Sequence, residues 1–286
     1  MKRTLMSLSI ALIMIGSLPS LYANSVEHVV IVSIDGGKPA ALKKSYMPHL
    51  NLITEEGSST FKAETIFPSS TLPSHTSMLT GVSPRVHKIT WNFWNPFRGP
   101  VEVPTIFSLA KAQRYSTALL ATKEKFRHLE VRNSLNLFSL RSQTALEVAR
   151  EAQSYLRSQK TRLTFIHMPD ADKAGHSWGW ESPQQIQALG NVDDALGIVL
   201  QTMREVFAGK SYVLIVTADH GGSGTDHGSA SPEDKLIPWI IWGTGVKKNY
   251  TITRNVSTMD TAATALWLLG VPAPRYWEGT PVEEAF

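Results

Sequence analysis

Residues 29–37 read Val-Val-Ile-Val-Ser-Ile-Asp-Gly-Gly, and this stretch decides the fold class. Its six leading residues are mostly β-branched, which predicts a strand buried on both faces of a sheet. The run ends at Asp35, and the two glycines after it permit a sharp turn. In parallel α/β sheets, ligands bind at the carboxyl ends of the strands. Asp35 is therefore a candidate site residue, although an Asp-Gly pair by itself is more often a plain turn.

Outward from this strand, the chain alternates between apolar strands and helical stretches, without an internal repeat or a long linker. Such alternation predicts an α/β fold with a mostly parallel central sheet and helices on both faces. We expect further strands at 59–66, 115–121, 163–168, 212–217 and 237–242, and helices at about 38–56, 73–80, 105–113, 142–158, 183–207 and 258–269.

The composition is that of a globular protein with a sizeable core, since 42% of its 286 residues are hydrophobic and 18% are charged. The chain contains no cysteine, which excludes thiolate metal sites and cysteine nucleophiles. Any metal ion must therefore be held by Asp, Glu and His side chains.

The first residues have the three parts of a signal peptide. The basic pair Lys2-Arg3 is followed by an almost wholly apolar run over 5–18, and Ala23 offers a small residue for cleavage. The apolar run is short for a membrane span, which needs about 20 residues, so an uncleaved anchor is the less favoured alternative. We expect export to the periplasm or the outside of the cell, with a signal peptide at 1–23 and one domain at 24–286.

The charge gives little reason to expect a polymeric partner. The chain has 28 basic and 24 acidic residues, and loss of 1–23 would remove Lys2 and Arg3 but no acid, which leaves 26 against 24. That balance is too small to favour nucleic acid or a membrane surface. We therefore expect a small-molecule substrate, no nucleic acid polymer and no stable membrane insertion after signal cleavage. The sequence does not determine the oligomeric state.

Asp219 and His220 close the apolar strand at 212–217 and are also followed by two glycines. Neighbouring residues of a regular strand point to opposite faces, so these two converge on one site only if the strand breaks there. A charged pair at the end of a buried strand is unfavourable unless something satisfies it, which favours a metal over a plain turn.

Asp172 and His176 follow the strand at 163–168 and are four residues apart, which places them on one face of a helical turn. A carboxylate plus an imidazole is a ligand set that suits zinc. Asp170 is a rival for the carboxylate, and a solvated acidic turn is the alternative without a metal.

His227 lies in a loop seven residues after His220, with Asp226 beside it as a supporting partner rather than a ligand. A lone loop histidine is usually just exposed, but the proximity of His220 favours a role in the site. The candidates then assemble into two triads, which predict two divalent metal ions, with zinc as the expected metal, placed to clamp the oxygens of an in-line displacement. The triads are Asp35, Asp219 and His220, and Asp172, His176 and His227.

Thr71 is the candidate nucleophile, and it lies just before a helix that Pro73 helps to open. A helix start offers unpaired N–H groups and a positive dipole end, which favour phosphate and alkoxide. A threonine hydroxyl is a weak nucleophile at neutral pH, and metal coordination is one way to activate it. From the residues alone, Thr71 could instead cap the helix, and three serines compete with it: Ser69, Ser70 and Ser74.

Together these motifs resemble the alkaline phosphatase superfamily, and most of all its nucleotide pyrophosphatase/phosphodiesterase (type I phosphodiesterase) branch. The resemblance implies an alkaline phosphatase-like fold and two zinc ions bound by the two triads, with Thr71 also contacting a metal. The stretches that carry it, in order along nearly the whole chain after residue 23, are Ser33–Gly36, Phe67–Gly81, Asp172–His176, Asp219–Gly221 and His227–Gly228.

The family pattern Phe-Pro-Thr-x-Thr-Phe-Pro-Asn-His aligns with 67–75, so the resemblance places the nucleophile of the family on Thr71. It also places the phosphate-binding Asn of the family on Asn92, as an oxyanion donor. It implies hydrolysis of phosphate esters through a phospho-threonine intermediate, by a phosphodiesterase or nucleotide pyrophosphatase. The departures at Ser69 and Ser74, and the little room for a substrate-capping domain, bear on nucleotide specificity more than on metal chemistry.

Two kinds of alternative remain open. Within the superfamily, a phosphomonoesterase or phosphonate hydrolase is the near rival, whereas a sulfatase would need a cysteine and a serine hydrolase a Gly-x-Ser-x-Gly motif. Outside the enzymes, the fold could serve as a binding scaffold. Basic residues after the strand at 115–121 either reach substrate anions or form a solvated loop. They are Lys123, Lys125, Arg127 and His128.

Overall fold

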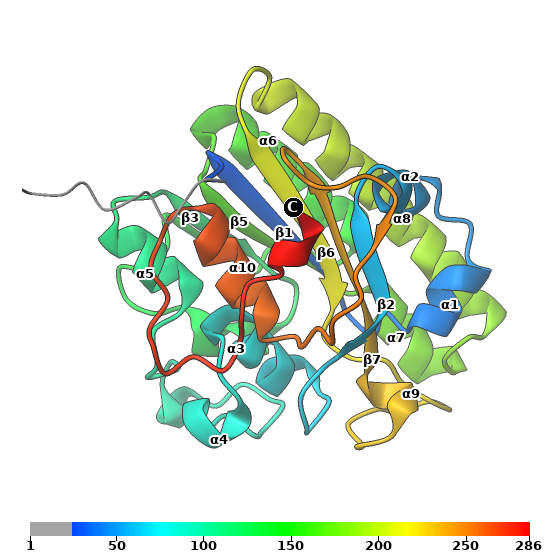
Figure 1. Ribbon diagram of the computed structural model, residues 1–286. Coiled ribbons are helices and arrows are strands. Elements are labelled where there is room, and N and C mark those ends of the chain that lie inside the picture. Colours follow the sequence, from blue (N-terminus) through cyan, green and yellow to red (C-terminus); the bar gives the residue numbers. More distant parts are fainter. Residues whose placement is uncertain (1–24) are drawn as a thin grey trace, which may run out of the picture.

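An eight-stranded sheet forms the centre of the computed structural model, which describes residues 25–286 (Figure 1). The signal peptide expected at 1–23 lies outside the described residues. The strands are β1 His28–Ile34, β2 Ser58–Glu64, β3 Thr117–Leu120, β4 Leu137–Ser139, β5 Leu163–Met168, β6 Tyr212–Ala218, β7 Leu236–Gly243 and β8 Tyr250–Thr251. Their order in the sheet is β4-β3-β5-β1-β6-β7-β2-β8, so that β1 lies in the middle.

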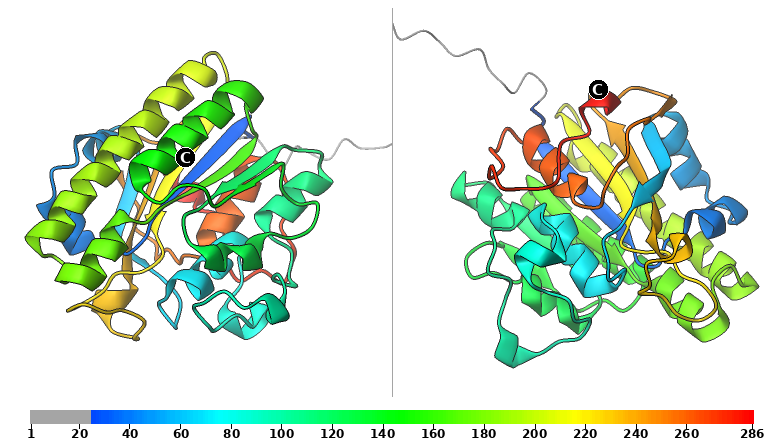
Figure 2. Two further views of the ribbon diagram at one scale, coloured as in Figure 1. Left: turned by 180° about the vertical axis from the view of Figure 1, so that it is seen from behind. Right: turned by 60° about the horizontal axis from the view of Figure 1, so that its bottom comes forward.

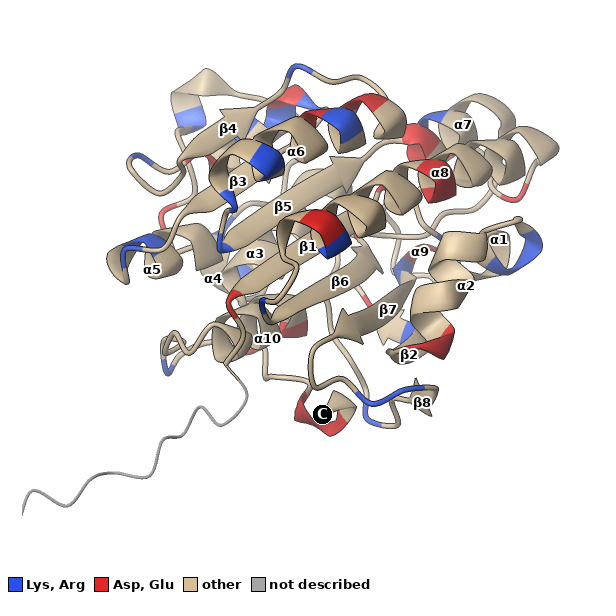
Figure 3. Ribbon diagram, turned by 90° about the horizontal axis from the view of Figure 1, so that it is seen from above, with Lys and Arg blue, Asp and Glu red and all other residues tan. Residues whose placement is uncertain are grey.

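The directions of the strands confirm the predicted α/β fold with a mostly parallel sheet. Among the strands of residues 25–286, only β7 runs against its neighbours, being antiparallel to both β6 and β2. The central strands β1, β5 and β6 carry no charged side chain, as Figure 3 shows from above. This is the composition of strands that are covered on both faces.

Helices cover both faces of the sheet (Figure 2). Successive side chains of β1 point to opposite faces, so its apolar residues contribute to the core on both sides. The helices are α1 Pro39–Lys44, α2 Pro48–Glu55, α3 Thr71–Thr80, α4 Pro84–His87, α5 Ile106–Ala112, α6 Ala145–Gln159, α7 Asp170–Trp178, α8 Pro183–Val206, α9 Pro232–Lys235 and α10 Asp260–Leu268, with 3₁₀ turns η1 Pro96–Arg98, η2 Glu124–Leu129 and η3 Glu283–Ala285. Val29 and Ile31 join a core with α3, α5 and α10, whereas Val30 and Val32 join a second core with α1, α2, α6 and α8. Within residues 25–286, no helix combines the length and the apolar character needed to cross a membrane.

The single helix expected at 38–56 is wrong, because the structure has two helices there, α1 and α2. Pro48 opens α2, and a proline disfavours helical backbone in the residue before it. Met47 accordingly has φ −132° and ψ 70°. The short strands β4 and β8 were not predicted, since so few residues show no periodicity. The other expected elements are present, with ends that shift by a few residues.

The register of the sheet brings three strand ends to the same edge. Ile34, the last residue of β1, is paired with Met168 at the end of β5 and with Ala218 at the end of β6. Asp35 and Asp219 therefore leave the sheet side by side, and α7 begins two residues after Met168. This is the edge at which α/β sheets bind their ligands.

Candidate active site

Asp35, Asp219 and His220 form a fully buried cluster directly beyond the ends of β1 and β6, here called the inner group. The Nε2 atom of His220 lies 3.3 Å from Oδ1 of Asp35 and 3.3 Å from Oδ2 of Asp219. β6 ends at Ala218, so the next two residues escape the alternation of the strand and turn toward one point.

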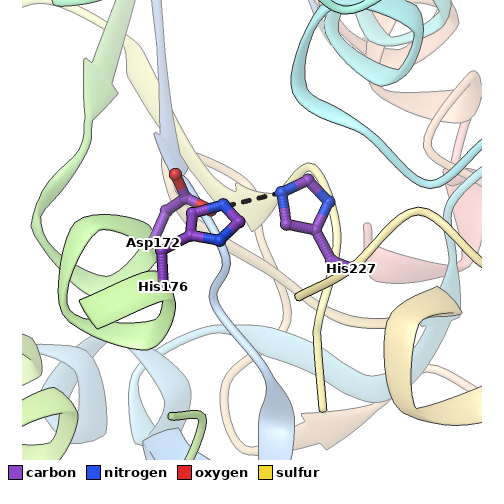
Figure 4. A group of neighbouring side chains, drawn as sticks. All are labelled: Asp172, His176 and His227. Atoms are coloured by element: carbon purple, nitrogen blue, oxygen red, sulfur yellow. Dashed lines mark ion pairs between the residues drawn. The ribbon is translucent and has the colours of Figure 1, made fainter. Parts of the chain in front are cut away.

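Asp172, His176 and His227 form the second cluster, here called the outer group (Figure 4). Oδ1 of Asp172 lies 3.4 Å from Nε2 of His176, one turn along α7, and 3.5 Å from Nε2 of His227. His227 reaches this point from the loop between β6 and β7. The imidazole of His176 is 42% exposed, whereas that of His227 is buried.

The two groups adjoin each other and form one centre. The rings of His220 and His227 stack with centroids 3.6 Å apart, and Nε2 of His220 lies 3.9 Å from Oδ1 of Asp172. The structure thus brings together all six side chains of the predicted triads, with the same membership in each group. Their role as metal ligands stays a prediction.

All three imidazoles point the same nitrogen toward the centre. Nδ1 of His220, His176 and His227 lies 2.8 to 3.0 Å from the main-chain oxygens of Gly221, Thr225 and Ser69, respectively. A carbonyl oxygen only accepts hydrogen bonds, so each Nδ1 carries the proton and donates it. In the neutral form of each ring, the lone pair of Nε2 is then directed into the centre, as in a metal-ligating histidine. His227 is supported by a main-chain oxygen and not by the carboxylate of Asp226, which accepts from the His227 N–H instead.

Each of the three carboxylates uses one oxygen for protein contacts and leaves the other without a partner. Oδ2 of Asp35 accepts from His167 at 2.7 Å, and Oδ1 of Asp219 accepts from the Gly36 N–H at 3.1 Å. The opposite oxygens of both carboxylates, like Oδ1 of Asp172, are buried without a hydrogen-bond partner among residues 25–286, as is Nε2 of His220. Buried polar atoms without partners are unfavourable, and divalent cations held by the two groups would satisfy all four.

The site concentrates negative charge in a buried place. Burial and the neighbouring charge of Asp35 raise the pKa of Asp219 to about 7. Burial alone would lower the pKa of His220, but the surrounding carboxylates, led by Asp219, raise it to about 9. Burial opposes ionisation of Asp35, yet the ammonium of Lys123 and the hydrogen bonds from His167 and His220 together outweigh it and hold the pKa of Asp35 well below its usual range. Such a field favours cations.

Thr71 is the first residue of α3, and Ser70 precedes it at the N-cap position, so Thr71 is not the helix cap. Its hydroxyl is buried and accepts a long hydrogen bond, 3.5 Å, from the ammonium of Lys123. The hydroxyls of two competing residues are engaged elsewhere. Ser69 donates to the Ser229 main-chain oxygen at 2.5 Å and Ser74 to that of Asp219 at 2.6 Å.

Asn92 lies beside the start of α3. Its side-chain oxygen accepts from the N–H of Leu72 at 2.9 Å and from the ammonium of Lys125 at 2.9 Å. Two donors on this oxygen fix the orientation of the amide, because the NH₂ group cannot accept. The NH₂ group is then the half of the amide that can donate to a ligand.

The basic segment after β3 divides between the site and the surface. Lys123 bridges the two groups, with its Nζ 2.5 Å from Oδ2 of Asp35 and 2.6 Å from Oδ2 of Asp172. Together with the bond from Lys125 to Asn92, this makes the solvated-loop alternative wrong for both lysines. The solvated-loop alternative is right for Arg127, which is exposed and has its Nε 3.5 Å from Oε1 of Glu124. His128 is fully buried and accepts from the Asn95 N–H at 3.1 Å.

Two further residues were missed in the sequence. His167 lies on β5, is fully buried, and donates from Nε2 to Asp35 while its Nδ1 accepts from the Thr122 hydroxyl at 2.8 Å. His75 donates to the Thr71 main-chain oxygen at 2.7 Å and accepts from the Ser33 hydroxyl at 2.8 Å, which ties α3 to β1. A histidine inside an apolar strand was the available signal for His167. Asp170, the rival carboxylate, accepts from the Ala145 N–H at 2.6 Å instead.

Comparison with known proteins places this geometry in a family. The chain matches the family model of type I phosphodiesterase / nucleotide pyrophosphatase over residues 29–106 and 111–239. It is 23% identical over 214 residues to ectonucleotide pyrophosphatase/phosphodiesterase family member 5 of Homo sapiens, which covers 68% of this chain and 45% of that protein. It is 31% identical over 136 residues to GPI ethanolamine phosphate transferase 1 of Saccharomyces cerevisiae, covering 41% of this chain and 15% of that protein. The chain spans less than half the length of these relatives.

Among solved structures, murine ectonucleotide pyrophosphatase/phosphodiesterase 5, in an inactive form in complex with AMP, is similar with a TM-score of 0.78. The match has 16% sequence identity and covers 91% of this chain and 99% of that chain, which shows a shared alkaline phosphatase-like fold. Because the family model matches well over half of the sequence, the chain belongs to the type I phosphodiesterase / nucleotide pyrophosphatase family.

Proposed function

We propose that this protein is a metal-dependent hydrolase of phosphate esters with Thr71 as its nucleophile. The observation that carries the proposal is the pair of carboxylate–imidazole groups whose unpartnered atoms face a common centre, with Lys123 contacting both groups and the Thr71 hydroxyl. Membership of a phosphodiesterase and pyrophosphatase family supports it.

The inner and outer groups would hold two divalent metal ions, with zinc as the metal that Asp and His ligands favour. When bound, the ions would supply positive charge to the attacking and leaving oxygens of an in-line displacement. The donor set fits, because three carboxylate oxygens and a histidine nitrogen are buried and unpartnered within the described part of the chain.

The residues of the chain then have defined tasks. Lys123 donates to Oγ1 of Thr71 and so stabilises negative charge on that oxygen. Attack forms a bond from Oγ1 to phosphorus, with the hydroxyl proton passing to solvent. It breaks the bond from phosphorus to the leaving oxygen, which departs with the alcohol or phosphate product and takes up a proton from water. Water then hydrolyses the phospho-threonine and restores the hydroxyl. The Asn92 amide and the N–H groups at the start of α3 are the donors available to the non-bridging oxygens.

Phosphoric diesters and anhydrides of the nucleotide type are the first candidate substrates, since the family carries that name and the similar murine structure holds AMP. Phosphomonoesters are the second candidate, and the two lysines favour them. Two ammonium groups beside Thr71 and Asn92 add positive charge that a monoester dianion balances better than a diester monoanion. We further propose that the protein is exported, on the strength of residues 1–23.

The substrate is tested by removing metals with a chelator, restoring zinc, manganese or magnesium, and measuring hydrolysis of bis(p-nitrophenyl) phosphate and p-nitrophenyl phosphate. We expect metal-dependent turnover, and the ratio of the two rates distinguishes the first candidate from the second. A protein that neither binds metal nor hydrolyses either ester would contradict the proposal and favour a binding scaffold.

The nucleophile is tested by Thr71→Ala. Turnover should fall by a factor on the order of 10³ or more, because no hydroxyl is left to attack, while the metal content stays unchanged. Mass spectrometry of the acid-quenched protein should find phosphate on Thr71 in the unsubstituted chain. Undiminished turnover in the variant would refute the assignment.

A further inference from the structure

One residue outside both groups touches every segment that carries a member of the inner or outer group. We propose that Trp180 is a positioning residue that holds the outer group in register with the inner group. This inference rests on the proposed function, because it concerns the same metal centre. It assigns to the indole a selective effect on one of the two metals.

The polar contacts of Trp180 join two of the ligand-bearing segments. Its Nε1–H donates to the main-chain oxygen of Gly36, at 3.2 Å, and Gly36 directly follows Asp35. Its main-chain N–H donates to the oxygen of Gly224, at 2.7 Å, in the loop that carries His227. One side chain with its backbone thus ties the end of β1 to the loop between β6 and β7.

The ring of Trp180 lies against two glycines whose missing side chains make room for it. A Cβ at Gly222, two residues after His220, would lie 2.3 Å from the indole, and a Cβ at Gly175 would lie 2.9 Å from it. Gly175 lies on α7 between Asp172 and His176. Neither glycine has a positive φ, so backbone conformation does not require them, and the close approach of the indole does.

The indole also contacts both imidazoles of the outer group directly. Its ring centroid lies 5.3 Å from that of His176 and 5.8 Å from that of His227, in edge-to-face arrangements. Such contacts restrict the rotation of the two rings about the line from Nδ1 to its carbonyl partner. A metal site held within about 0.5 Å of its geometry needs support of this kind.

The two groups differ in how much they depend on this support. In the inner group, Asp35 is held by His167, and one oxygen of Asp219 accepts from the N–H groups of both Gly36 and His220. In the outer group, His176 is partly exposed. Among residues 25–286, its ring is held only by the bond to Thr225, the neighbouring Asp172 and the rings around it. Loss of the indole should therefore loosen the outer group first.

The test is Trp180→Leu, which removes the indole but keeps an apolar side chain. Zinc is titrated by calorimetry into the chelator-treated, full-length protein. We expect two binding events in the unsubstituted chain, and in the variant a loss of about 10–100-fold in the affinity of one event with the other unchanged. Trp178→Leu is the matched control, because Trp178 lies two residues away on the same segment and is 63% exposed. It should change neither event.

Two further variants keep the inference open to contradiction if Trp180→Leu folds poorly. Trp180→Phe keeps a ring but loses the N–H bond to Gly36, and should weaken the same event by a smaller factor. Gly222→Ala should also weaken it, through the clash with the indole, and in the double variant with Trp180→Leu the two losses should not add.

Equal weakening of both events, unchanged affinities, or additive losses in the double variant would overturn the role of Trp180. Failure of the unsubstituted protein to bind two metal ions would instead contradict the proposed function. The two failures are therefore distinguishable in the same titration.

Discussion

The inner and outer groups contain similar side chains but are built in different ways. The inner group lies at the ends of two strands and is fully buried. In each of its three side chains, the polar atom that points away from the centre has a main-chain or side-chain partner. The outer group combines one turn of α7 with a loop, and one of its imidazoles faces solvent. The sheet therefore fixes one half of the centre, the inner group. The geometry of the adjustable half, the outer group, depends on how α7, the loop between β6 and β7 and the indole of Trp180 pack together.

The largest effect should come from Asp35→Asn in the fixed half. Asp35 contacts His220, His167 and Lys123, so neutralising it removes a ligand charge and disturbs all three partners. We expect loss of the inner metal and a fall in turnover of about 10³-fold or more. Metal analysis after dialysis and steady-state kinetics measure both. Asp170→Asn is the control, since that carboxylate caps α6 and should leave metal content unchanged; equal effects of both variants would remove the distinction.

A more selective effect is expected from His176→Gln in the adjustable half. The outer metal should be lost and turnover reduced, while the inner event in a zinc titration is retained. The free energy of unfolding in chelator should change by less than about 0.5 kcal/mol, because the side chain is partly exposed and its loss leaves no buried cavity. Chemical denaturation measures the stability. Loss of both metals would show that the two halves form a single cooperative unit.

A smaller effect concerns Lys125, the lysine that contacts Asn92 and does not bridge the two groups. Lys125→Met removes one ammonium beside Asn92, and should lower kcat/KM for a monoester about 10-fold more than for a diester. Arg127→Met, on the same η2 turn but at the surface, serves as control. A parallel fall for both ester classes would assign Lys125 to the orientation of Asn92 rather than to the charge of the substrate.

The smallest expected effect is the release of protons when the inner metal binds. The pKa of His220 is raised to about 9 by the nearby carboxylates, so at pH 7.5 this imidazole is protonated and must lose about one proton to ligate a metal. Affinity for the inner metal should therefore rise with pH until that pKa is passed. Burial lowers the pKa of His227 to about 4, so this residue of the outer group releases none. Calorimetry in buffers of different ionisation enthalpy counts the protons. An inner event without proton release would contradict the assignment of His220.

Local pattern was enough to place the strands and the carboxylates at their ends. Residues 29–34 are apolar except for Ser33, and the charged Asp35 follows directly, so the burial of the strand and the position of Asp35 both follow from composition. The spacing of Asp172 and His176 likewise fixes their common face within one turn. These features depend on neighbours in the chain, which the sequence displays directly.

Features that depend on distant segments could not be predicted in this way. His167 looks like a core residue of β5 until the register places it beside Asp35, 132 residues away. The inward direction of Lys123 depends on carboxylates that β1 and α7 bring together. The break between α1 and α2 had a local signal in Pro48, but the apolar pattern over 38–56 obscured it.

The reversed direction of β7 has a consequence for how such a centre can vary. A parallel partner for β6 would need a crossover that carries the chain to the opposite end of the sheet. Because β7 is antiparallel to β6, the segment 219–235 begins and ends at the same edge of the sheet. All of its residues can therefore lie at the edge that carries the centre. A change in the length or composition of this one connection would move His227 while β6 and β7 keep their pairing. The geometry of the outer group can therefore change without any change in the sheet.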